Sequence, residues 1–231
     1  MHAEIVGTTL PVLEIRLDPG DDLVAEPAQL SWMRGPVRLN TKMMTAGAGG
    51  ILGVFGRALA GGGLFMTEFT VEGGPGEVAF AARVPGTIHA VGVEPGHGML
   101  IHRNGFLCAT GGVELGIGFQ QSLGAGIFGG NGFVLQRLTG RCTAWVELGG
   151  ETVVKDLAPG EQIFVHPGHV GMFEERVGFE ITTVPGVRNM LFGGDGLFLA
   201  VLTGPGRVWL QTLTLPGLAH ALAPYFPQPP R

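Results

Sequence analysis

The chain has 231 residues, a formal net charge of −5 and 45% hydrophobic residues, which exclude a disordered low-complexity chain and allow one large all-β domain or two ordinary domains. Its 14 Lys and Arg form no basic stripe, so we expect no nucleic-acid partner. Only 14% of the residues are charged, which is too few to cover a monomer's surface and favours a homo-oligomer.

The first part of the chain, from Leu10 onwards, has the pattern of a β-meander. Apolar residues dominate the segment LPVLEIRL, which leads into the turn Asp18-Pro19-Gly20-Asp21. Proline fixes φ and glycine accepts a positive φ, so Pro-Gly favours a tight turn. Three more strand-like segments follow, with the sequences LVAEP, AQLSWM and VRLNT.

The stretch Ala46–Phe69 is rich in glycine, and its signature occurs three times. Each copy is a glycine cluster that leads directly into an apolar, strand-like segment. The copies are GGGLFM at Gly61–Met66, GGNGFVL at Gly129–Leu135 and GGDGLFL at Gly193–Leu199. This self-similarity predicts three equivalent strands in a repeated β architecture. The part Ala46–Ala60 has no counterpart of equal length, which indicates an insertion.

Pro-Gly turns repeat in one register and give the clearest sign of three units. The dipeptide begins at Pro19, Pro95 and Pro159. Seven residues after each proline, the chain carries in turn Glu26, His102 and His166, and eighteen residues after it Val37, Val113 and Val177. A register kept without gaps in three copies predicts three β-units.

The Pro-Gly turns and the glycine-led strands together predict one β body built from repeats over residues 1–215. Its units are at 1–60 together with 196–215, at 61–128 and at 129–192. In this arrangement the N- and C-terminal strands pair and complete the first unit in one closed body, which hides sheet edges as ring-like β folds do. Residues 216–231 form a proline-rich tail, in which Pro216–Ala223 offers a short helix. We therefore expect an all-β, sandwich-like fold with little helix.

Three segments resemble a known family. They are GGILGVFGRALAGGGLF, the PGEQIFVHPGHVGMF run at Pro159–Phe173, and the GGDGLF start. Together they are similar to the uncharacterised prokaryotic relatives of fungal altered-inheritance-of-mitochondria protein 24, over about Leu10 to Leu215. The resemblance implies a double-stranded β-helix of the type seen in the tryptophan RNA-binding attenuation protein, with internal duplication and trimers. It implies no established catalytic residue. Arg57 matches the family's Arg-containing loop, whereas His166 replaces an acidic residue.

Glu26, His102 and His166 share one repeat position and are the candidate metal ligands. His and carboxylate side chains bind zinc or iron, and three ligands with an open position suit a catalytic site. The three side chains would converge if the units surrounded a common axis. The alternative is that they are exposed residues on three distant turns. We predict no cofactor.

Other catalytic signatures are weak. PGEQIFVHPGH is loosely similar to the second cupin motif, but His97 and His102 lie five residues apart, whereas the first cupin motif needs two histidines one residue apart. The glycine-rich loop ends in Gly56-Arg57-Ala58 and lacks the Gly-Lys-Ser/Thr end of a phosphate loop. The only serines, Ser31 and Ser122, form no Gly-x-Ser-x-Gly elbow.

An apolar contact surface in the insertion is the third candidate site. An apolar loop on flexible glycines, in a chain with little charge, is expected to pack against a neighbouring subunit, to plug the end of the β body, or to enter a lipid interface. We favour these roles in that order. The residues are Ile51, Leu52, Val54, Phe55 and Leu59.

We therefore expect a non-enzymatic, homo-oligomeric β scaffold or interaction module, most simply a homotrimer, that makes contacts through this loop. A metal-dependent cupin-like enzyme or a small-ligand binder is the alternative, and a peripheral membrane-associating protein is a further one. A second protein or a membrane surface would then be the partner. Cys108 and Cys142 lie in apolar runs without CxxC spacing, so we expect buried, reduced thiols and a cytoplasmic protein. The N-terminus has no secretory-signal pattern.

Overall fold

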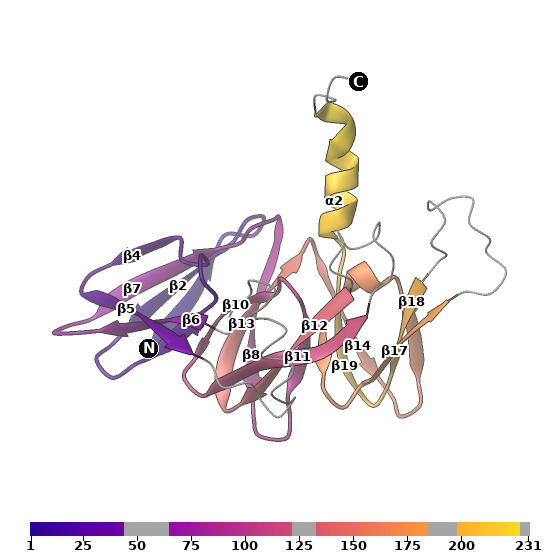
Figure 1. Cartoon of the computed structure of the whole chain (residues 1–231), viewed down its shortest axis with the longest axis horizontal. Coiled ribbons are helices and arrows are strands. Elements are labelled where there is room, and N and C mark those ends of the chain that lie inside the picture. Colours follow the sequence, from indigo (N-terminus) through magenta and orange to yellow (C-terminus); the bar gives the residue numbers. More distant parts are fainter. Residues whose placement is uncertain (44–64, 122–132, 184–197, 227–231) are drawn as a thin grey trace.

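The structure is a computed structural model, and it describes residues 1–43, 65–121, 133–183 and 198–226. The described chain consists mainly of β-strands, which confirms the all-β expectation (Figure 1). The strands are β1 (His2–Val6), β2 (Val12–Leu17), β3 (Leu23–Ala25), β4 (Trp32–Arg34), β5 (Val37–Met43), β6 (Phe65–Val71), β7 (Gly76–Ala81), β8 (Gly86–Val93), β9 (Met99–His102), β10 (Phe106–Thr110), β11 (Val113–Gln121), β12 (Phe133–Gly140), β13 (Cys142–Gly149), β14 (Thr152–Leu157), β15 (Gln162–Val165), β16 (Val170–Glu174), β17 (Gly178–Thr183), β18 (Phe198–Thr203) and β19 (Gly206–Gln211). The helical elements are η1 (Pro167–His169), α2 (Leu215–Leu222) and η2 (Ala223–Tyr225).

All three predicted Pro-Gly turns form. Gly20, Gly96 and Gly160 have φ angles of 99°, 82° and 77°, which glycine adopts without steric cost. In each turn, the residue after the glycine donates its backbone N–H to the carbonyl oxygen of the residue before the proline, at 2.9, 2.9 and 3.0 Å. The turns therefore start the equivalent strands β3, β9 and β15 in the same way.

The described strands form antiparallel sheets whose pairing pattern recurs with a shift of six strands. The orders are β1-β2-β7-β4, β5-β6-β3-β10-β13-β8, β11-β12-β9-β16-β19-β14 and β15-β18-β17. Thus β7 lies between β2 and β4, β13 between β8 and β10, and β19 between β14 and β16. Likewise β6, β12 and β18 lie between β3 and β5, β9 and β11, and β15 and β17. The two six-stranded sheets join successive groups through the pairs β3–β10 and β9–β16.

The predicted pairing of the N- and C-terminal strands is wrong. β1 and β2 pair with each other and β2 pairs with β7, whereas β19 pairs with β14 and β16. The groups follow one another along the long axis, with β4 and β7 at one end and β17 and β18 at the other, instead of closing on themselves (Figure 1). The reason is that each glycine-led strand pair inserts between the strands that precede it in the chain, which requires shorter loop closures than joining the chain ends.

Alternation of apolar residues builds the core. In β2, the side chains of Leu13, Ile15 and Leu17 are fully buried on one face. They belong to a cluster in which the rings of Phe69 and Phe80 meet edge to face, with centroids 5.7 Å apart. A second cluster fills the middle of the molecule, and a third lies among the C-terminal strands. Burial of these apolar faces is the main term that stabilises the fold.

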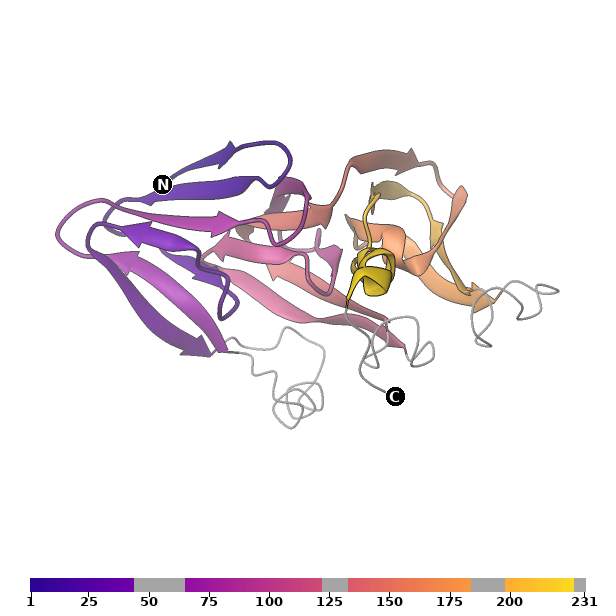
Figure 2. The ribbon, with the colours of Figure 1, turned by 90° about the horizontal axis from the view of Figure 1, so that it is seen from above.

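The C-terminal helix α2 stands apart from the strands. It projects from the body in Figure 1 and is seen end-on in Figure 2, and none of its residues is buried. Thr214 caps its N-terminus, because the hydroxyl oxygen accepts a 3.0 Å hydrogen bond from the Gly217 amide. The helix matches the predicted Pro216–Ala223 segment to within one residue. Among the described residues, no helix has the length and apolar character needed to span a bilayer.

Candidate functional site

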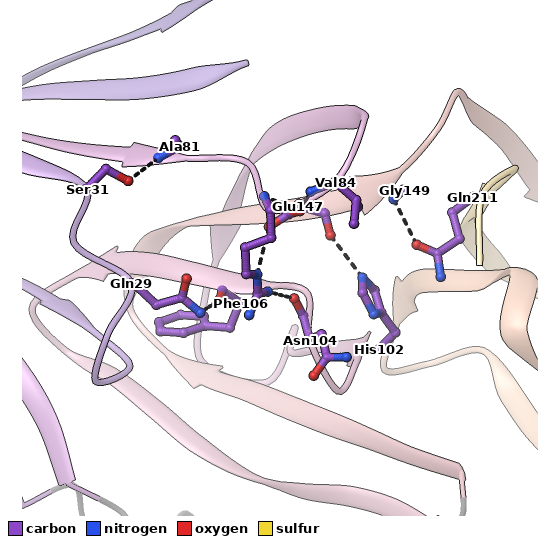
Figure 3. Close-up of polar contacts among 11 residues, drawn as sticks. Gln29, Ser31, Ala81, Val84, His102, Asn104, Phe106, Glu147, Gly149 and Gln211 are labelled. Carbon is purple, nitrogen blue, oxygen red and sulfur yellow. Dashed lines mark hydrogen bonds and ion pairs between the residues drawn. The ribbon is translucent and has the colours of Figure 1, made fainter. Parts of the chain in front are cut away.

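A buried carboxylate, that of Glu147 on β13, lies at the centre of the most developed polar cluster. Only 3% of its surface is exposed. One oxygen accepts hydrogen bonds from the backbone amides of Arg83 and Val84, at 2.9 and 3.3 Å, and the other accepts one from Nε of Arg83 at 3.2 Å. A buried charge is tolerated when it is paired and hydrogen-bonded. Glu147 therefore fastens the turn between β7 and β8 to β13 (Figure 3).

The guanidinium of Arg83 extends this cluster to the turn between β9 and β10. Besides Glu147, it donates to the carbonyl oxygen of Asn104. The Arg83 side chain is 42% exposed, so its ion pair with Glu147 is screened on one side by water. The cluster thus joins the turn between β7 and β8, the turn between β9 and β10, and strand β13, which lie far apart in the sequence.

His102, the last residue of β9, completes the cluster from the other side. Its Nε2 lies 2.9 Å from the backbone carbonyl oxygen of Glu147 and donates to it, because a carbonyl can only accept (Figure 3). Burial lowers the pKa of His102 from 6.5 to about 4, and the nearby Arg83 charge also lowers it. The ring is therefore neutral at physiological pH and serves as a donor to the backbone.

Gln211 on β19 occupies the position that Glu147 has on β13. Glu147 is the pairing partner of Ile88, and Gln211 that of Thr152, on the equivalent strands β8 and β14. The Gln211 side chain accepts from the Gly149 amide at 3.0 Å and donates to the Gly168 carbonyl oxygen at 2.9 Å. Both side chains therefore bind the turn that follows the preceding glycine-led strand pair.

A groove of about 990 Å³ lies beside the cluster, between the strands and α2. Residues that line it include Arg83, His102, Arg103, Gln211, Thr214 and His220. Its described lining contains no serine, cysteine, lysine or tyrosine, and its single carboxylate, that of Glu147, is already held by three N–H groups. The Glu147 carboxylate is therefore engaged in structural contacts, while the imidazole of His220 on α2 also lines the groove.

The structure does not bring the predicted metal ligands together. Each follows or ends an equivalent strand, as the register predicted, but Glu26 accepts a 2.7 Å hydrogen bond from Gln136, and His166 accepts a 3.3 Å one from the Gly168 amide. Across the described ranges, no group of three His, Cys, Asp or Glu side chains is arranged to hold a metal ion. The reason is that β3, β9 and β15 belong to three different sheets placed one after another.

The predicted apolar contact surface is not among the residues that the structure describes. Ile51, Leu52, Val54, Phe55 and Leu59 lie outside the described residues. The motifs and the repeat register did not point to Glu147, although a lone glutamate inside the apolar run CTAWVEL is the signal by which a buried, paired carboxylate is found.

Comparisons with known proteins cover nearly the whole chain. The sequence model of a family described as mitochondrial biogenesis AIM24 matches residues 3–213. An uncharacterized protein of Streptococcus pyogenes serotype M6 is 25% identical over 221 residues, which are 94% of this chain and 87% of that protein. A crystal structure of a Streptococcus pyogenes protein has a TM-score of 0.74 and 23% identity, and the match covers 97% of this chain and 99% of that one. This likeness supports the fold.

Proposed function

Because this chain belongs to the mitochondrial biogenesis AIM24 family, whose model covers nearly its whole length, we propose a function that rests on architecture: a non-enzymatic, homo-oligomeric β scaffold, assembled as a homotrimer. One observation carries this proposal. The strands at the two ends of the molecule, β4 and β15, expose large apolar side chains, with Trp32 45%, Met33 48% and Phe164 59% exposed. Apolar side chains on edge strands mark a surface that another chain covers.

The proposal includes three internal units, each of six strands. Their limits are β2–β7 (12–81), β8–β13 (86–149) and β14–β19 (152–211), as the recurring pairing pattern favours. Each unit places three strands in one sheet and three in another, as the two sides of a double-stranded β-helix do. Only 14% of the residues in the chain are charged, so a second copy that covers the apolar ends of these units would stabilise them.

Native mass tests the proposal directly. Light scattering after size-exclusion chromatography should give three times the 24.1 kDa mass of one chain at micromolar concentration. A mass of a single chain over the whole concentration range would contradict self-association and with it the scaffold.

Attachment to a lipid surface is a second candidate, favoured by the C-terminal segment. α2 has no buried residue, and the segment that follows it exposes Tyr225 (85%) and Phe226 (63%). Aromatic side chains beside an apolar helix suit a lipid interface. The full chain should co-sediment with liposomes, and a chain that ends at Thr214 should not. Equal recovery of both chains in the supernatant would exclude this role.

A further inference from the structure

The groove between the strands and α2 contains polar side chains that the fold already uses. On the strand side, the carboxylate of Glu147 accepts three N–H groups, and the imidazole of His102 donates to a backbone carbonyl oxygen. The side-chain amide of Gln211 is both a donor and an acceptor for the backbone. These three side chains are committed to the fold, so the remaining groups decide what the groove can bind.

The groups that remain include cationic side chains. Arg103, in the turn between β9 and β10, lines the groove and is exposed, and within the described part of the chain its side chain has no ion-pair or hydrogen-bond partner. Arg83 uses two guanidinium nitrogens, one for Glu147 and one for the Asn104 carbonyl oxygen, and a guanidinium carries five N–H groups. The imidazole of His220 lines the groove from α2. Groups that can bind an anion therefore come from the strand side and from the helix.

The groove has an excess of positive charge, although the chain as a whole is acidic. The guanidinium groups of Arg83 and Arg103 stand against one carboxylate, that of Glu147, and the described lining contains no other acidic residue. Burial lowers the pKa of His102 to about 4, so this ring adds no charge near neutral pH. With His220 neutral, the groove carries one excess positive charge, whereas the chain carries −5. A concave site of this sign attracts an anion.

The α2 side of the groove is apolar. Leu215, Ala219 and Ala223 line it, and their spacing of four residues places them on one face of the helical segment. No residue of α2 is buried, and Leu215 is 45% exposed. From the body, Val134 and Leu213 add further apolar surface. Apolar walls combined with a few polar groups are the usual lining of a small-molecule site.

The size and the two kinds of lining narrow the class of ligand. The volume of about 990 Å³ lies at the upper end of the range of about 300–1,000 Å³ that small-molecule sites have. A small inorganic anion would leave the apolar face of α2 uncovered, and an uncharged hydrocarbon would make no use of Arg103. A single-chain molecule with one negative charge at its head satisfies both parts of the groove.

We propose that this groove binds a long-chain carboxylate, with its head group on Arg103 and its hydrocarbon chain along the α2 face of Leu215, Ala219 and Ala223. A guanidinium matches both oxygens of a carboxylate in a bidentate pair. The bound chain covers apolar surface on the helix and on the body, and so holds α2 against the strands. The site lies within one chain and does not depend on the proposed self-association. It differs from attachment to a lipid surface because the ligand is a single dissolved molecule.

Titration with soluble carboxylates tests the class of ligand. Isothermal titration calorimetry of the full chain with dodecanoate, below its critical micelle concentration, should show one site per chain. From octanoate to dodecanoate, each added methylene should tighten binding up to about fourfold. Dodecyltrimethylammonium, which has the same hydrocarbon chain and the opposite charge, should not bind. Equal affinity for the two charges, or affinity that does not rise with chain length, would overturn the site.

Substitutions on both sides of the groove test its position. Arg103→Gln should weaken dodecanoate binding about 10- to 100-fold, and Arg16→Gln, at an exposed position on β2, should leave it unchanged. Ala219→Glu places a carboxylate in the groove and should abolish binding. Ala221→Glu is its matched control, because Ala221 lies on the same helix, is exposed and is outside the lining. Unmodified affinity in either groove variant, with an unchanged far-UV circular dichroism spectrum, would contradict the proposal.

Thermal unfolding tests the part played by α2. At a hundred times its Kd, dodecanoate should raise the Tm of the full chain by about 5–10 °C. A chain that ends at Thr214 lacks the apolar wall, so its Tm should not change. An equal rise in both chains would place the ligand away from α2.

The outcomes are distinguishable from those that test the proposed function. A protein with the mass of one chain that binds dodecanoate would contradict the scaffold and support the groove site, whereas an assembled protein that binds none would overturn the site alone. Co-sedimentation with liposomes without binding of dissolved dodecanoate would also overturn the site and support attachment to a lipid surface.

Discussion

At the scale of single residues, the polar cluster around Glu147 connects β13 to the turn before β8 and to the end of β9. Its carboxylate receives three N–H groups from the Arg83–Val84 turn, and His102 binds the same residue through its carbonyl oxygen. These contacts connect the Arg83–Val84 turn, β9 and β13. The cluster thus fixes the turn between β7 and β8 to β13.

Glu147→Ala should be strongly destabilising. The substitution leaves two buried amides without their acceptor and Arg83 without its partner, which costs about 3 kcal/mol of the free energy of unfolding. Urea denaturation measures this difference. Glu180→Ala, at an exposed position on β17, should change the free energy by less than about 0.5 kcal/mol. Equal effects of the two substitutions would contradict the structural role of Glu147.

His102 makes stability depend on pH. Its pKa in the folded protein is about 4, below the usual 6.5, so the unfolded chain binds more protons between these values and the free energy of unfolding falls as the pH drops from 6.5 to 4. The shift corresponds to about 3 kcal/mol.

Comparison of unfolding at pH 7 and pH 5 isolates this contribution. His102→Asn should flatten the pH dependence, while His220→Asn on α2 should leave it unchanged. A variant at position 102 that keeps the full slope would assign the effect to other groups, such as His89 and His166, whose pKa values burial also lowers.

The repeat position of these residues was predictable, but their partners were not. The seven-residue offset from Pro95 and Pro159 places His102 at the end of β9 and His166 directly after β15. The register gives a position relative to each Pro-Gly turn and contains no information on the distance between the turns. Metal ligation was therefore a natural hypothesis for Glu26, His102 and His166, and the sequential placement of their sheets removes it within one chain.

At the scale of elements, the strands were more predictable than their pairing. The Pro-Gly turns and the glycine-led segments predicted where β3, β9 and β15, and β12 and β18, lie. Whether β18 and β19 pair with the strands before them or with the N-terminal strands depends on contacts between distant segments. Local sequence patterns contain no information on such contacts. The wrong pairing of the chain ends follows from this ambiguity.

The helix α2 should be dispensable for folding. It buries none of its residues, so a chain that ends at Thr214 should unfold at the same urea concentration as the full chain, within about 0.5 kcal/mol. A chain that ends at Pro205 provides the contrast, because it lacks β19, whose partners are β14 and β16, and it should not fold. A large loss on removing α2 alone would show that the helix packs on the body.

At the scale of the whole molecule, the open ends of the strand row should couple folding to concentration. Self-association that requires the folded edges raises the melting temperature as the protein concentration rises. Tm should therefore increase over a hundredfold concentration range for the unmodified protein and stay constant for Met33→Glu. A constant Tm for both would place the assembly outside the folding equilibrium and contradict the coupling.

The order β1-β2-β7-β4 has a practical consequence for engineering. β1 lies at one edge of its sheet and β4, with its exposed apolar side chains, at the other, so the N-terminus and the β4 edge are separated by the full width of the sheet. A reporter domain fused before Met1 therefore leaves the β4 edge uncovered, and the fusion protein should still self-associate. A reporter domain inserted between β3 and β4 lies beside that edge and would block self-association, so the protein should be monomeric.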